Sequence, residues 1–146
     1  MWRFNKLLIV KRKKRSRHCT SVTEHYLKYK EVARELALAR LHHFNQYYNL
    51  SWNRVAIRNQ RRRWGSCSSL KNLNFNYKII FLPPHLQDYI IVHELCHLAH
   101  LNHSADFWAL VSEQVPDYEM RRKELRAIDK LGHSVEILCK LGIKYQ

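Results

Sequence analysis

The chain has 146 residues, enough for one domain with a hydrophobic core but not for two. Hydrophobic residues make up 46% of it, and with only 3 glycines and 3 prolines it is not a largely unstructured chain. Lysine and arginine (26) outnumber aspartate and glutamate (12), so the net charge of +14 favours contact with polyanions.

The positive charge is concentrated at the N-terminus. Residues 1–17 contain eight Lys or Arg and no acidic residue, so we expect a basic arm over residues 1–22 ahead of a domain over residues 23–146. Such an arm attracts the phosphates of nucleic acid, although a solvated terminus without a partner explains it equally well. The candidate nucleic-acid-binding residues are Lys11, Arg12, Lys13, Lys14, Arg15 and Arg17.

No segment predicts a membrane span or a secretion signal. The apolar run of residues 7–10 is far shorter than the roughly 18 residues of a spanning helix, and the basic run follows it, unlike in a signal peptide. The four cysteines form no C-x-x-C pair, which is typical of reduced thiols. We therefore expect a cytoplasmic protein without a membrane partner.

The first half of the chain predicts one helix and two strands. Residues 24–48 carry apolar side chains at helical spacing without Gly or Pro. Residues 52–59 and 73–79 alternate apolar and polar side chains, as strands with one buried face do. Because residues 65–72 are rich in turn formers, we expect the two strands to be antiparallel neighbours joined by a loop.

The second half predicts helices. Pro83 and Pro84 stop the sheet and open the first of them, Ser104 caps the second, and Gly132 ends the third. The expected helices cover residues 85–101, 105–114, 117–131 and 135–141.

The first of these helices contains His93-Glu94-Leu95-Cys96-His97, which has the form H-E-x-x-H. Residues four apart share a helix face, so both imidazoles can bind one Zn²⁺ ion, which lowers the pKa of a bound water to about 7. Glu94 can take that water's proton and pass it to the leaving amine. The motif therefore predicts hydrolysis of peptide bonds by a metal-activated water, with Glu94 as general base.

The third ligand is open to more than one interpretation. His103 is favoured because the chain can fold back if the helix ends at Asn102, a residue type that tolerates the left-handed conformation. His100 lies near the same helix face, but a straight helix would carry it about 10.5 Å from His93. A downstream carboxylate is the remaining alternative. The candidates are Glu113 and Glu119.

Three segments of the chain read RRRWGSCSS, LNFNYKIIFLPPHLQDYIIVHELCHLAHLNHSADFWALV and VPDYEMRRKEL. Together they resemble the YgjP-like metallopeptidase family, which is related more distantly to SprT-like and Spartan-type proteases. By this resemblance the ligands of one zinc ion are His93, His97 and His103, and Glu94 is the catalytic carboxylate. The implied fold is α+β, a compact zincin-like domain with an N-terminal helix, a small antiparallel sheet, an active-site helix and C-terminal helices.

The segment before the expected turn is a candidate substrate site. In zincin-like folds a strand edge near the metal can hold an extended peptide by main-chain hydrogen bonds. Gly65 would permit close backbone approach, and Arg63 would bind a carboxylate or stabilise the oxyanion. The alternative is that Trp64 is a core residue and Arg61–Arg63 a solvated surface. The candidate substrate-binding residues are Arg63, Trp64, Gly65 and Ser66.

Two functions are therefore compatible with the sequence. One is a zinc peptidase acting on protein or peptide substrates, and the other is a nucleic-acid-binding protein with a structural or vestigial metal site. An intact Glu94 favours the peptidase, because a structural zinc site prefers four protein ligands and has no use for this carboxylate. By analogy with Spartan-type relatives, the two functions combine in a protease acting on DNA-associated proteins.

Overall fold

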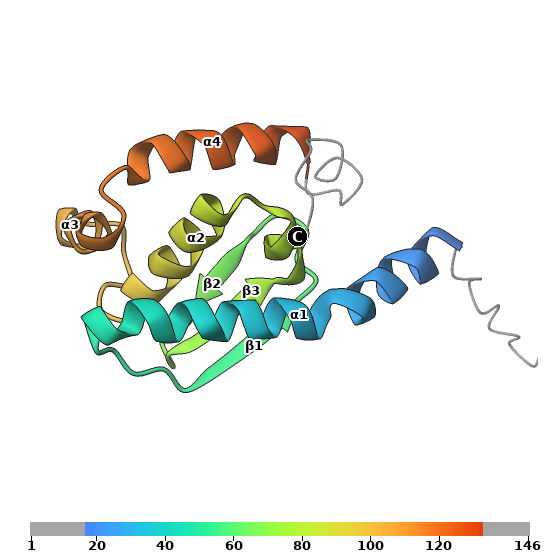
Figure 1. Cartoon of the computed structure of the whole chain (residues 1–146), viewed down its shortest axis with the longest axis horizontal. Helices are drawn as coiled ribbons and strands as arrows, with labels where there is room; N and C mark the ends of the chain where they lie inside the picture. Colours follow the sequence, from blue (N-terminus) through green and yellow to red (C-terminus); the bar gives the residue numbers. More distant parts are fainter. Residues whose placement is uncertain (1–16, 133–146) are drawn as a thin grey trace, which may run out of the picture.

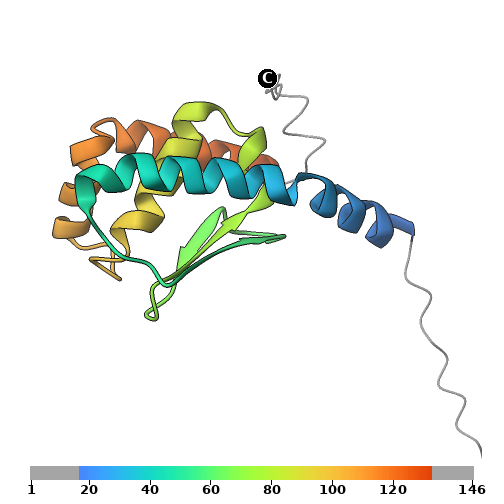
Figure 2. The same ribbon diagram turned by 60° about the horizontal axis from the view of Figure 1, so that its bottom comes forward.

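The described part of the chain, residues 17–132 of a computed structural model, forms two layers, with side chains described from residue 23 on. The strands lie on one side of the molecule and the helices cover the other (Figures 1 and 2), so the core forms between them. The elements are α1 (Arg17–Tyr48), β1 (Arg54–Arg58), β2 (Gly65–Cys67), β3 (Asn72–Asn76), the 3-10 helix η1 (Tyr77–Phe81), α2 (Pro84–Cys96), α3 (Ala105–Gln114) and α4 (Tyr118–Leu131).

Helix α1 begins at Arg17, earlier than the predicted start at residue 24, and so includes the end of the expected basic arm. The rest of the arm, residues 1–16, lies outside the described residues, as does the helix expected over residues 135–141. The buried stripe of α1 packs in the core, and the Arg40 guanidinium donates two hydrogen bonds to the Asp88 carboxylate on α2. Its buried residues are Ala33, Ala37, Leu41 and Phe44.

The sheet corrects the expected strand pairing. Strands β1 and β3 correspond to the two predicted strands, but they are parallel, with Val55 opposite Leu73. The antiparallel partner of β3 is the short strand β2, and the strand order is β1-β3-β2. Strand β2 lies within the segment predicted as a loop, so the chain reverses direction between β1 and β2 and again between β2 and β3. The fold is therefore α+β with a mixed sheet.

The second predicted strand also ends early. Strand β3 stops at Asn76, and residues 77–81 form η1 in place of the predicted continuation. The Asn76 side chain accepts a hydrogen bond from the Lys78 N–H at 3.3 Å, which caps η1 and competes with strand pairing. This turn brings the chain to Pro84, where α2 begins.

The remaining helices begin within one residue of their predicted starts. The Ser104 hydroxyl accepts a hydrogen bond from the Phe107 N–H at 3.3 Å and caps α3, and α4 ends at Leu131 before Gly132. Helix α2, predicted to reach residue 101, ends instead at Cys96. Within residues 17–132, no helix is long and apolar enough to cross a membrane.

Candidate metal centre

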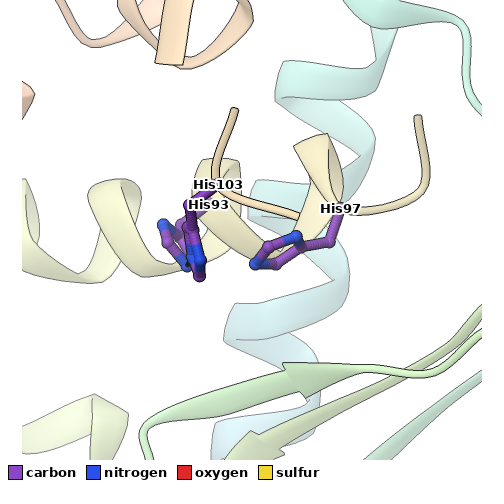
Figure 3. Close-up of side chains that lie close together, drawn as sticks. All are labelled: His93, His97 and His103. Atoms are coloured by element: carbon purple, nitrogen blue, oxygen red, sulfur yellow. Dashed lines mark hydrogen bonds between the residues drawn. The ribbon is translucent and has the colours of Figure 1, made fainter. Parts of the chain in front are cut away.

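Three histidines, two from the end of α2 and one from the loop that follows it, converge at one point. His93 and His97 lie four residues apart on this helix and its C-cap, and His103 follows in the loop before α3. Figure 3 shows their imidazoles turned toward one another, and one ring nitrogen from each lies within 4.8 Å of the others. Among residues 23–132, this is the group of at least three potential ligands placed to hold one ion.

The chain reaches this arrangement by a different route from the one predicted. Because α2 ends at Cys96, the chain has turned well before Asn102, which is not among the residues with positive φ. His100 lies beyond the helix end and contributes its carbonyl oxygen rather than its ring to the site.

The spacing and charge state of the three imidazoles fit a zinc ion. The Nε2 atoms of His93 and His103 are 3.1 Å apart, and tetrahedral Zn–N bonds of about 2.0–2.1 Å put two nitrogens roughly 3.3 Å apart. Burial, followed by the charges of His97 and His103, lowers the pKa of His93 to about 3. Burial also lowers the pKa of His103. Both rings are therefore neutral at physiological pH, the form that binds metal.

The tautomer of His97 is set by a main-chain contact. Its Nδ1 lies 2.9 Å from the His100 carbonyl oxygen. Because a carbonyl oxygen only accepts hydrogen bonds, Nδ1 must carry the proton, which leaves Nε2 as the free ligand atom. His100, whose ring is not a ligand, thus orients the ligand His97 through its backbone carbonyl.

Two aromatic residues of α3 support the three rings. Phe107 is fully buried and stacks on His97 at a centroid distance of 4.5 Å, with edge contacts to His93 and His103. Trp108 stacks on His103 at 5.5 Å. Capping of α3 by Ser104 directly after His103 places both side chains against the site.

Trp108 is itself held by contacts with α4. Its indole stacks on Tyr118 at 5.0 Å, and the Arg122 guanidinium lies 4.8 Å from its centroid. We expect Trp108→Ala to weaken zinc binding about tenfold, because His103 loses the ring that fixes its orientation. Competition with a chromophoric chelator measures this affinity. Trp52→Ala, which removes a ring packed near His42 on α1, is the matched control, and equal affinities in the two variants would contradict the prediction.

Glu94 lies buried beside the ligands and is 6% exposed. Burial raises the pKa of Glu94 to about 8, against the opposing charge of Arg63. Its Oε2 is buried and has no hydrogen-bond partner among the described residues. A buried carboxyl group with a free oxygen is unusual in a purely structural position and is available to exchange a proton.

Gly65 on β2 makes the position of Glu94 possible. A Cβ atom at residue 65 would lie 2.6 Å from the Glu94 Cγ and 2.7 Å from its Oε1, closer than real side chains approach. Strand β2 therefore approaches α2 so closely at Gly65 that only glycine fits beside the Glu94 side chain.

The predicted substrate segment lines a cavity next to this contact. Arg63, Trp64 and Gly65 form part of the wall of a cavity of about 190 Å³, together with His93 and Glu94 of α2. Trp64 is also a core residue, 6% exposed, and its indole donates a hydrogen bond to the Asp129 carboxylate at 2.7 Å. Ser66 does not line the cavity, and its hydroxyl accepts a hydrogen bond from the Asn74 amide.

The loop that carries Arg63 is held by Asn76, a residue outside all the predicted site residues. Asn76 is fully buried, and its side-chain amide donates hydrogen bonds to the carbonyl oxygens of Gln60 and Arg63 at 2.8 and 2.9 Å. Its backbone N–H donates to the Trp64 carbonyl at 2.7 Å. The signal that could have identified Asn76 is a polar residue at the end of a strand with a buried face, because a buried polar side chain needs hydrogen-bond partners.

The comparisons with known proteins agree with this geometry. The model of the YgjP-like metallopeptidase domain matches residues 2–128. No curated protein matches the chain significantly. Similar solved structures include two metallopeptidase zymogens.

The first, abylysin of Pyrococcus abyssi, is 24% identical with a TM-score of 0.55 and covers 65% of this chain and 94% of its own. The second, jannalysin of Methanocaldococcus jannaschii, is 27% identical with a TM-score of 0.51 and covers 68% of this chain and 96% of its own. The family model matches most of the chain, and the two solved structures share its fold. The chain belongs to the YgjP-like metallopeptidase domain family and is a metal-dependent peptidase.

Proposed function

We propose that this protein hydrolyses peptide bonds with one zinc ion held by His93, His97 and His103 and with Glu94 as general base. The observation that carries the proposal is the buried Glu94 carboxyl group, which has a free oxygen and directly follows a ligand in the chain. Three nitrogen ligands suit a catalytic zinc site, because such a site keeps one coordination position open.

A zinc ion at this position would lower the pKa of a water molecule to about 7. Glu94 accepts a proton at its carboxylate and then delivers it to the nitrogen of the leaving amine. Burial raises the pKa of Glu94 in the metal-free protein, and the positive charge of a bound zinc ion would oppose that rise and favour the carboxylate that accepts the proton. Glu94 and His93 share the wall of the cavity, which places this proton transfer where a substrate can enter.

The free edge of β2 is the proposed binding site for the peptide backbone. Hydrogen bonds from Asn76 N–H to the Trp64 carbonyl and from Ser68 N–H to the Asn72 carbonyl bracket the pairing of β2 with β3. In an antiparallel pair such bonds alternate, so the main-chain groups of Gly65 and Cys67 point away from β3. An extended peptide can pair with them by strand addition.

The experiment that tests the proposal removes the metal. We expect the purified protein to hold one zinc per chain and to cleave an unfolded protein substrate. Chelation followed by desalting should abolish cleavage, and stoichiometric Zn²⁺ should restore it. Zinc is measured by atomic emission and cleavage by gel and mass spectrometry. A protein that takes up no zinc, or that cleaves equally well without it, would refute the proposal.

A nucleic-acid partner is supported by charge alone. The net charge of +14 favours binding of phosphates, but Lys11–Arg15 lie outside the described residues and the side chain of Arg17 is not described. Protein or peptide substrates are therefore the proposed partners of the site itself.

A further inference from the structure

The cavity beside Glu94 has a composition suited to one kind of substrate group. Its volume of about 190 Å³ is below the roughly 300–1,000 Å³ of pockets for drug-sized ligands, so it accommodates a single side chain or chain end. Glu94 is its one acidic lining residue, and its other walls are aromatic, aliphatic or cationic. The remaining lining residues are Arg63, Trp64, Gly65, Tyr89, Ile90, His93 and Leu125.

One arginine lines this cavity, and two others act on Tyr89 in its wall. Arg63 lies in its wall and is close enough to Glu94 to act on its charge. Arg122 and Arg126 belong to α4, and both act electrostatically on the Tyr89 hydroxyl. Within the described residues none of the three forms an ion pair. Arg63 thus places a positive charge in the cavity wall, and Arg122 and Arg126 add positive charge near Tyr89.

Tyr89 contributes a hydrogen-bond donor to the same place. It precedes His93 by one helical turn on α2, and their ring centroids are 5.8 Å apart. A tyrosine hydroxyl, with an ordinary pKa of about 10, is protonated at neutral pH and can donate its O–H to an anion in the cavity.

We propose that this cavity is a carboxylate-binding subsite in which Arg63 and Tyr89, with Arg126 adding positive charge nearby, select substrates that carry a carboxylate next to the scissile bond. The inference rests on the proposed function, because the subsite shares His93 and Glu94 with the reaction centre. The carboxylate belongs either to an Asp or Glu side chain or to the free end of a peptide. In both forms Arg63 binds it by charge-assisted hydrogen bonds and the apolar walls contact its carbon atoms.

The test uses the full-length, zinc-loaded protein and two matched pairs of peptides. One pair has blocked ends and differs only in a single Glu or Gln in an otherwise neutral sequence. The other pair is neutral and ends in a free α-carboxylate or an amide. Binding is measured by calorimetry in the Glu94→Gln variant, which separates affinity from cleavage. For the wild type, kcat/KM is measured and the cut position is mapped by mass spectrometry.

We expect the carboxylate member of at least one pair to bind about tenfold more tightly than its neutral partner. Arg63→Gln should reduce that preference to below about threefold, and Arg126→Gln and Tyr89→Phe should each lower it in part. Arg58→Gln, which removes an exposed arginine of β1, is the matched control and should retain the full preference. Higher ionic strength should weaken the preference.

The two pairs distinguish the sources of the carboxylate. A preference in the blocked pair assigns the subsite to acidic side chains, and a preference in the other pair assigns it to chain ends. Equal affinities in both pairs, or an equal loss in Arg58→Gln and Arg63→Gln, would overturn the inference. Calorimetry separates these outcomes even if the wild type cleaves nothing, a result that would refute the proposed function instead.

Discussion

Glu94→Gln is expected to lower kcat by at least about 100-fold while leaving the zinc content of the protein unchanged. Glutamine keeps the shape of the side chain but can neither accept nor deliver the proton. The three ligand nitrogens come from other residues, so the metal should stay bound. Single-turnover cleavage and zinc analysis of the same preparation check both parts, and His97→Ala, which should lose zinc together with activity, is the contrasting variant.

The same substitution should stabilise the metal-free protein. Burial raises the pKa of Glu94 from 4.5 to about 8, so between these values the unfolded state has released a proton that the folded state still binds. The contribution of Glu94 to the free energy of unfolding therefore falls as pH rises from 4.5 toward 8 and is constant below 4.5. At pH 7 the cost is about 3 kcal/mol, from roughly 1.4 kcal/mol per pH unit.

Denaturant unfolding of the metal-free wild type and Glu94→Gln, at pH 4 and pH 7, measures this difference. We expect the variant to be more stable at pH 7 and the two proteins to agree near pH 4. A variant that is less stable at pH 7 would show that the wild-type carboxylate is well solvated or well paired in the folded state. Stability given up at a reacting group is a recognised cost of function.

Gly65→Ala is expected to lower kcat/KM about 100-fold and the free energy of unfolding by about 1–3 kcal/mol. The new Cβ would lie 2.8 Å from the Glu94 Cδ, so the carboxyl group must move away from the site or the sheet must move away from α2. Either movement displaces the proton acceptor relative to the metal ligands.

A double-mutant cycle with Glu94→Asp separates this contact from a general effect on β2. Aspartate is one methylene shorter, so Gly65→Ala should cost less stability in the Glu94→Asp background than in the wild type. Activity should stay low in the double variant, because the shorter carboxyl group does not reach the same position. Additive losses of stability would mean that the damage from alanine lies elsewhere.

Helices and strands whose ends depend on residues close in the chain could be predicted from the sequence. Helix α3 begins after Ser104 as expected, because the capping hydroxyl and the helix that it caps are neighbours in the chain. The pairing of β1 with β3 was predicted with the wrong direction. Its direction depends on β2, and a strand of three residues containing Gly65 and Ser66 is too short to show periodicity.

The candidate site divides in the same way. His93, Glu94 and His97 could be placed together because helical spacing relates them, and His103 because it follows within one turn of chain. Phe107 and Trp108 could not, since their contacts with the histidines depend on how α3 docks after the helix end. The sequence also does not reveal long-range contacts such as the hydrogen bond from the Asn76 amide to the Arg63 carbonyl. It shows only that a polar residue stands at a position expected to be buried.

The early end of α2 has a consequence for how the protein opens. His97 and His103 bracket the loop between α2 and α3, so an ion bound to both closes a short covalent ring, as a disulfide would. Without the ion, this loop is held by the backbone hydrogen bonds of Leu98, Ala99 and His100 to the end of α2, by the α3 cap and by the packing of Phe107. Amide hydrogens of residues 98–104 should therefore exchange with solvent faster in the metal-free protein, and their protection is a direct measure of site occupancy.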